Sequence, residues 1–129
     1  MSARILVVDD SATVRHWIMK QLQGYDVRLA FDGQDGIARA IEIEPDLILM
    51  DVVMPHMDGL AACRALRRNP VTASLPIIMV TSQDEEWDVA EGYVSGCTDY
   101  IAKPVDPEEL LVKVATWLAA TARTPDLPA

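Results

Sequence analysis

Short apolar runs alternate with amphipathic segments along nearly the whole chain. Most of the runs are continuously apolar, which is typical of parallel strands that are buried on both faces. We predict five such strands, at residues 4–8, 26–30, 46–50, 77–80 and 98–102. Strand and helix therefore alternate, and this pattern predicts an α/β fold.

Between the strands, apolar residues recur at intervals of three and four, which predicts five helices. The second helix should end before Pro45, because a proline disfavours helical backbone in the residue that precedes it. The third is expected to turn Arg64, Arg67 and Arg68 toward water. The fourth should cover roughly residues 84–94, with Gly96 closing it.

The last helix has the clearest start. Asp106 is a natural N-cap, Pro107 suits the first turn, and acidic residues follow where the helix dipole favours them. Its expected buried face consists of Leu110, Leu111, Val114, Trp117 and Leu118. Residues 121–129 contain two prolines and no apolar period, so we interpret 1–120 as one domain and 121–129 as a flexible tail or a truncated linker.

Right-handed crossovers would turn these units into a three-layer doubly wound sandwich around a five-stranded parallel sheet. The spacing of the elements leaves the order of the strands open.

Composition narrows the class of protein. A net charge of −9 argues against direct nucleic-acid binding, which calls for a basic surface. No apolar run approaches membrane-spanning length, and the N-terminus lacks a signal-peptide pattern. The cysteines Cys63 and Cys97 have no metal-ligand spacing and are interpreted as reduced thiols. We therefore expect a cytoplasmic protein.

Polar residues follow the apolar runs at the points where the strands end. Asp9 and Asp10 follow the first strand, and Asp51, Thr81 and Lys103 follow the third, fourth and fifth. Each could be an ordinary cap or a solvated side chain. Because the carboxyl ends of parallel strands share one edge, however, the five should meet where open α/β sheets bind ligands.

This set of residues suits phosphoryl transfer onto an aspartate. Clustered carboxylates repel one another unless a cation intervenes, and oxygen ligands on an open rim suit Mg²⁺. Magnesium and a nearby lysine would neutralise an incoming phosphoryl group, so that a carboxylate held between them could act as the nucleophile. The hydroxyl of Thr81 could then hydrogen-bond the phosphoryl oxygens.

The chain resembles the receiver domain of two-component response regulators over residues 4 to about 120. The matching pieces, in order, are VVDDS at 7–11, DVVMPHMDG at 51–59, VT at 80–81, Gly96 with DY at 99–100, and KP at 103–104.

The resemblance implies a flavodoxin-like sheet of order 2-1-3-4-5 and a specific set of site residues. Asp51 would be the phosphoacceptor and a Mg²⁺ ligand together with Asp10, while Asp9 would hold a coordinated water and the Val53 carbonyl would contribute. Lys103 would pair with the phosphoryl group. The implied switch pair is Thr81 and Tyr100, and the implied cis peptide bond is Lys103–Pro104.

The implied function is a signalling switch that is phosphorylated by a histidine kinase or a phosphotransfer protein. It would act on no substrate other than itself. Its fourth helix, fifth strand and fifth helix would present a face to an effector or to a second copy of the chain. The positions of Val53 and Gln83 border the hydrolytic water in the family, and because neither is charged here, we expect a long-lived phosphorylated state.

Other classes of protein fit less well. A hydrolase of the haloacid-dehalogenase type would need an acid where Val53 stands. A flavodoxin-like electron carrier would need a phosphate-binding loop after the first strand, where Asp9 and Asp10 would repel the phosphate. A protein-binding module that works without phosphorylation stays open as the alternative.

Overall fold

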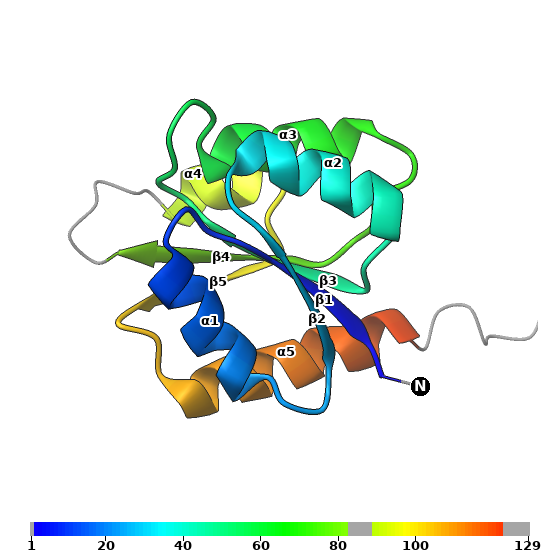
Figure 1. The fold of residues 1–129 in the computed structure, drawn as a ribbon. Helices are drawn as coiled ribbons and strands as arrows, with labels where there is room; N and C mark the ends of the chain where they lie inside the picture. Colours follow the sequence, from blue (N-terminus) through cyan, green and yellow to red (C-terminus); the bar gives the residue numbers. More distant parts are fainter. Residues whose placement is uncertain (1, 83–88, 123–129) are drawn as a thin grey trace, which may run out of the picture.

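The computed structural model describes residues 2–82 and 89–122, and these fold around one parallel sheet (Figure 1). The strands lie in the order β2-β1-β3-β4-β5, as the resemblance implied. Their bounds are β1 Arg4–Val8, β2 Asp26–Ala30, β3 Leu47–Asp51, β4 Ile77–Ser82 and β5 Asp99–Lys103. The helices of the described residues are α1 Ala12–Gln21, α2 Gly33–Ile43, α3 Gly59–Arg68, α4 Val89–Val94 and α5 Pro107–Ala122.

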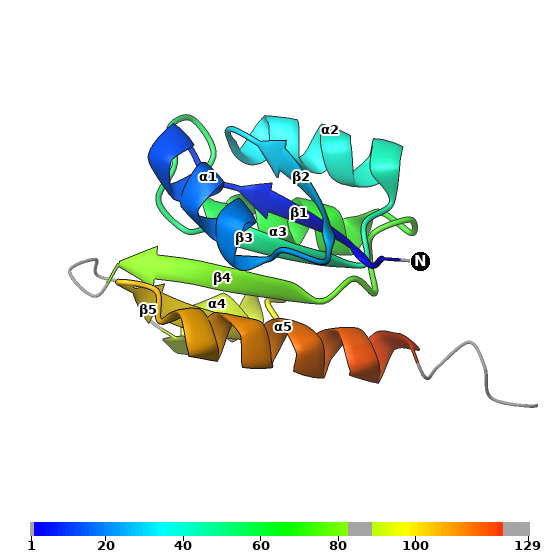
Figure 2. The same ribbon diagram turned by 60° about the horizontal axis from the view of Figure 1, so that its bottom comes forward.

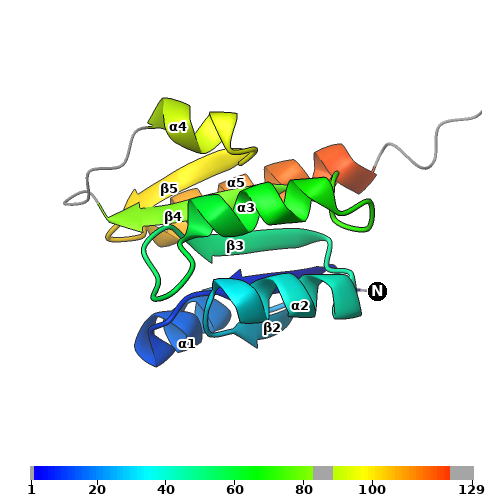
Figure 3. The same cartoon turned by 90° about the horizontal axis from the view of Figure 1, so that it is seen from above.

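Helices cover both faces of the sheet. Figures 1 and 3 show α2, α3 and α4 on one face, and Figure 2 brings α5 forward on the other face, which α1 also covers. Alternate residues of each buried strand supply the two cores. Leu6, Ile48 and Met79 pack against α2 and α3, whereas Ile5, Leu49 and Ile78 pack against α1 and α5. The three-layer prediction is confirmed.

Side-chain caps define the starts of three helices. Ser11, Asp32 and Asp58 each accept a hydrogen bond from a backbone N–H in the first turn of the helix that follows. At α5, the Asp106 carboxylate accepts from the N–H of Glu109 at 3.1 Å, as the sequence predicted. Ser11, Asp32 and Asp106 lie within three residues of the end of a strand, so these caps also mark where the chain turns away from the carboxyl edge of the sheet.

Some expectations about faces and ends are wrong. Leu111 is 41% exposed although it was expected on the buried face of α5, whereas Leu110 and Val114 are buried there as predicted. Strands β3 and β5 lie one residue later than predicted, and β4 extends to Ser82. Helix α5 continues to Ala122, so the expected tail loses its first two residues to the helix and the rest of it lies outside the described residues.

The prediction that the arginines of α3 face water is wrong for Arg67. Its guanidinium does not extend into water. It donates to the carbonyls of Leu75 and Gly96 at 2.6 and 2.8 Å, and it therefore ties the end of α3 to the loops that precede β4 and β5. Of the predicted fourth helix, the structure describes only Val89–Val94, because residues 83–88 lie outside the described part of the chain.

Candidate functional site

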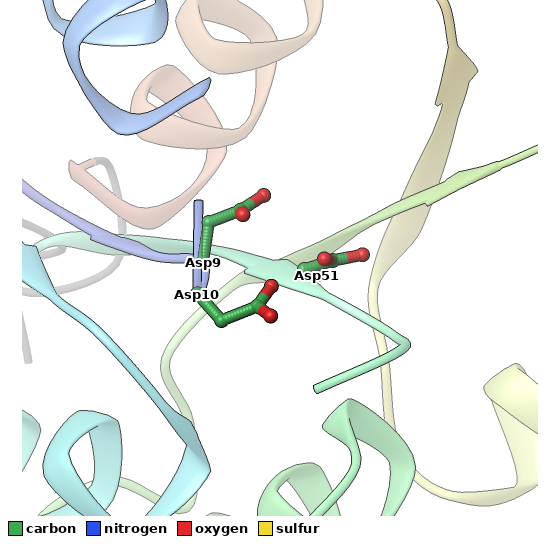
Figure 4. A group of neighbouring side chains, drawn as sticks. All are labelled: Asp9, Asp10 and Asp51. Carbon is green, nitrogen blue, oxygen red and sulfur yellow. The ribbon is translucent and has the colours of Figure 1, made fainter. Parts of the chain in front are cut away.

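Three carboxylates converge at the carboxyl edge of the sheet. Asp9 and Asp10 follow β1 directly, and Asp51 is the last residue of the neighbouring strand β3. Each offers an oxygen, and these oxygens all lie within 4.8 Å of one another. Figure 4 shows the three side chains, which extend from the neighbouring ends of β1 and β3. Asp9 and Asp51 are buried, at 2% and 6% exposure, whereas Asp10 is open to solvent.

Asp9 is held by contacts that the sequence did not predict. Its carboxylate accepts from the N–H of Ser11 at 2.9 Å, and its own N–H donates to the Ala30 carbonyl at 3.1 Å. The guanidinium of Arg15, one turn into α1, donates to the Asp9 carbonyl at 2.7 Å. Nothing in the spacing of Arg15 marked this role. These contacts fix the bend at the end of β1 and hence the direction of both neighbouring carboxylates.

The turn after Asp51 is equally constrained. The N–H of Val53 donates to the Asp51 carboxylate, the N–H of Val52 bonds to the Val80 carbonyl at 3.2 Å, and the N–H of Gly59 bonds to the Val52 carbonyl at 2.7 Å. A Cβ at Gly59 would overlap the carbonyl oxygen of Asp51. The loop therefore closes on the strand only because residue 59 has no side chain.

Lys103 joins the carboxylates from the end of β5. Its Nζ lies 3.5 Å from a carboxylate oxygen of Asp9 and 3.5 Å from one of Asp51. The peptide bond that follows it, Lys103–Pro104, is cis, as expected. One ammonium thus stands between two buried carboxylates.

The charge balance of this group is incomplete. Burial and the negative charge of Asp9 raise the pKa of Asp51 to about 6, although Lys103 and the N–H of Val53 act in the opposite direction. The ionised form of Asp51 is therefore disfavoured at this edge until a further positive charge arrives.

Thr81 and Tyr100 lie on the neighbouring strands. Thr81 is buried near the end of β4, one residue beyond Val80, which is the register partner of Asp51. Its hydroxyl donates a long hydrogen bond, 3.5 Å, to the Ser82 carbonyl. Tyr100 lies within β5, opposite Met79, and its half-buried ring packs against the core on the α2 and α3 face. The role of Thr81 and Tyr100 as a switch pair stays a prediction.

The predicted residues are thus assembled as far as the structure describes them. Asp9, Asp10, Asp51 and Lys103 form one group, with Thr81 on the strand beside it. The Val53 side chain is 49% exposed and apolar, and Gln83 lies outside the described residues.

The donor set fits a magnesium ion. Three carboxylates supply hard oxygen ligands, one of them solvent-exposed. Burial and the charge of Asp9 raise the pKa of Asp51, and a bound cation would favour its ionised form. No thiol or imidazole stands in the group to favour a softer metal.

Comparison with known proteins gives a consistent result. The family model described as "Response regulator receiver domain" matches residues 5–115. The chain is 43% identical over 119 residues to Protein PilH of Pseudomonas aeruginosa, covering 91% of this chain and 98% of that protein. It is 40% identical over 124 residues to the DNA-binding dual master transcriptional regulator RpaA of Synechocystis, covering 95% of this chain but only 52% of the relative.

A solved receiver-domain structure is also similar to this chain. The receiver domain of sensor histidine kinase PA1611 of Pseudomonas aeruginosa, which has a magnesium ion coordinated in its active-site cleft, superposes with a TM-score of 0.85. The two sequences are 31% identical, and the match covers 92% of this chain and 99% of that one. Among the residues that the structure describes, no helix has the length and apolar character needed to cross a bilayer.

Proposed function

The chain belongs to the response regulator receiver domain family, and on that premise we propose that it is a switch whose state is set by Mg²⁺-dependent phosphorylation of Asp51. The observation that carries this proposal is the group formed by Asp9, Asp10, Asp51 and Lys103. It combines a nucleophile, a set of metal ligands and a fixed ammonium at one edge of the sheet.

Asp51 is the best candidate for the nucleophile. Its carboxylate lies at the centre of the group, where the N–H of Val53 and the ammonium of Lys103 orient it. An oxygen of Asp51 would form a bond to phosphorus while the bond from phosphorus to the donor breaks and the donor leaves with the bonding electrons. Lys103 would meet the negative charge of the arriving phosphoryl oxygens.

Asp10 and Asp51 would hold the magnesium ion, with Asp9 orienting a coordinated water and the carbonyl of Val53 adding a ligand. When bound, the ion would neutralise phosphoryl charge during transfer. The fit of the donor set and the magnesium ion in the PA1611 receiver domain support this assignment.

The phosphoryl group would act on the switch through its charge. Its oxygens would attract the hydroxyl of Thr81, whose hydrogen bond to the Ser82 carbonyl is long at 3.5 Å, and movement of Thr81 would open space for the ring of Tyr100. Because Lys103 and Tyr100 share β5, both effects reach the same strand. The surface formed by α4, β5 and α5 would then change its affinity for a partner.

The partners belong to known classes. Receiver domains exchange signals with histidine kinases and with effector domains, and we infer a histidine kinase or phosphotransfer protein as donor here, in the cytoplasm. The chain spans about half the length of RpaA and 26% of Response regulator PleD of Caulobacter vibrioides, so an effector could be another domain or a separate protein. With a net charge of −9, this domain is poorly suited to contact DNA itself.

Intact-mass measurement tests the proposal. The protein is incubated with Mg²⁺ and acetyl phosphate, beside Asp51→Asn and beside a sample in which EDTA removes the metal. A phosphoryl adduct that forms only in the wild type with Mg²⁺ is the expected result. An adduct that persists in Asp51→Asn would place the acceptor elsewhere. If a folded wild type forms no phosphoryl adduct, the alternative is favoured, a protein-binding module that works without phosphorylation.

A further inference from the structure

Lys113 makes an unusual set of contacts with the proposed switch residue. From the middle of α5, its Nζ donates to the backbone carbonyl of Tyr100 at 2.7 Å and lies 5.3 Å from the centroid of the same residue's ring. A cation at this distance from an aromatic ring is attracted to its face. One ammonium thus contacts both the backbone and the ring of Tyr100.

The ammonium is itself held in place. Asp99 and Glu109 each accept from Lys113 Nζ at 3.3 Å, from β5 and from the preceding turn of α5. The Asp99 carboxylate also accepts from the N–H of Tyr100 at 2.8 Å and from the indole N–H of Trp117 at 2.9 Å. Although burial works against the charge of Lys113, the two carboxylates outweigh it and raise the pKa of the ammonium above its ordinary value.

The position of β5 in the sheet explains why side chains bond to the backbone of Tyr100. β5 is an edge strand of the described sheet, so the backbone groups on its outer side have no neighbouring strand to bond. At Tyr100, the N–H is taken by Asp99 and the carbonyl by Lys113. The backbone of Tyr100 is therefore anchored to α5 by side chains, and α5 can influence the strand that carries the switch.

We propose that Lys113 is a positioning residue for Tyr100 and holds its ring in the place seen here, which we assign to the resting state because the Thr81 hydroxyl donates to the Ser82 carbonyl. The proposal rests on the proposed function, in which Tyr100 moves when a phosphoryl group arrives. In the structure, the ring lies beside the ammonium. A move away from it would give up this contact, so Lys113 biases the switch toward its resting state.

The size of the bias follows from the contact that is lost. A partly exposed cation–ring contact corresponds to about a 2- to 5-fold change in an equilibrium constant. Removing the ammonium should therefore increase the affinity for a phosphoryl mimic by about that factor, since the mimic binds the other state better. The affinity for Mg²⁺ alone should not change, because Lys113 contacts none of the carboxylates of the metal site.

The test compares Lys113→Met with Lys113→Arg. Each full-length variant is saturated with Mg²⁺ and titrated with beryllium fluoride, which mimics a phosphoryl group, and Mg²⁺ is titrated separately. We expect Lys113→Met to bind the mimic about 2- to 5-fold more tightly. Lys113→Arg should restore wild-type binding, because a guanidinium also stacks on a ring. Ring-proton NMR signals of Tyr100 in Lys113→Met without the mimic should shift toward those of the mimic-bound wild type.

Two controls separate positioning from a general loss of packing. Glu109→Gln removes an ion pair of Lys113 but leaves the ammonium beside Tyr100, so it should bind the mimic as the wild type does. In a Tyr100→Leu background, Lys113→Met should have no effect. Equal mimic binding by wild type and Lys113→Met, or an unchanged effect in the Tyr100→Leu background, would overturn this inference alone. A folded wild type that binds no mimic would overturn the proposed function and the inference with it.

Discussion

Asp51→Asn should stabilise the protein in the absence of metal, although it removes the proposed phosphoacceptor. Burial and the neighbouring charge of Asp9 raise the pKa of Asp51 from an ordinary 3.8 to about 6. The folded state therefore disfavours the ionised carboxylate, even with Lys103 at 3.5 Å. Asparagine has nearly the same shape and no charge, so the variant avoids this cost.

The magnitude follows from the shift. Each pKa unit corresponds to about 1.4 kcal/mol, and a shift of about two units gives about 3 kcal/mol, or about 2 kcal/mol after allowance for partial solvation. For a domain of this size, that corresponds to an increase in melting temperature of about 8 °C.

The pH dependence has a definite sign. Between about pH 4 and pH 6, folded Asp51 holds a proton that the unfolded chain has released, so the unfolding free energy of the wild type falls as the pH rises through this window. The variant lacks this fall. The two proteins should therefore be equally stable near pH 4 and should differ fully above about pH 6.5.

The assay is urea unfolding in EDTA from pH 4 to 8, repeated with excess Mg²⁺. The matched control is Asp58→Asn, the same substitution at an exposed N-cap, where asparagine caps as well as aspartate does. Excess Mg²⁺ should stabilise the wild type more than Asp51→Asn and so reduce or reverse the difference, because the variant has lost a ligand. Equal stability of wild type and Asp51→Asn at pH 7.5 in EDTA, or a difference that is the same at pH 4, would refute the reasoning.

Two other substitutions and the lifetime of the phosphorylated form provide further tests. Gly59→Ala should lower the unfolding free energy by about 3 kcal/mol, since its Cβ would overlap the Asp51 carbonyl, and Mg²⁺ binding to the folded fraction should weaken; unchanged urea unfolding would contradict this. Arg67→Met should cost about 2 kcal/mol by leaving carbonyls before β4 and β5 without their donor, whereas Arg68→Met, at an exposed position, should have little effect. Finally, the apolar side chain of Val53 offers no charged group that could orient a hydrolytic water. The phosphorylated form should therefore outlast a lifetime of seconds without a phosphatase, as followed by intact mass.

Most of the fold follows from the pattern of apolar residues, because burial on both faces makes parallel strands easy to recognise. The predicted bounds of β1 and β2 agree with the structure. The pattern says less about helix faces. Leu111 lies next to the buried Leu110, and its own accessibility depends on the angle at which α5 crosses the sheet. The strand order came from the resemblance to receiver domains, since spacing along the chain does not encode it.

The residues of the site, like the elements of the fold, could be predicted only in part. Polar residues at strand ends were visible because the carboxyl ends of parallel strands share an edge, and this argument brought Asp9, Asp10, Asp51 and Lys103 together. The residues that support the site were not visible. Arg15 and Lys113 donate to backbone carbonyls, and any long cation on those helices would look the same in a sequence. Such contacts depend on packing between elements, which periodicity does not report.

The charges at this edge explain why the site needs more than its own residues. Lys103 lies between two buried carboxylates and is 3.5 Å from each, so its single charge cannot neutralise both. Burial and the negative charge of Asp9 together raise the pKa of Asp51 to about 6. A divalent cation would more than compensate for the remaining negative charge, and the excess positive charge would then favour an incoming phosphoryl group. A tighter ion pair between Lys103 and Asp51 would stabilise the resting protein but would weaken its need for a cation. The imperfect charge balance is thus what makes the site receptive to metal and then to phosphate.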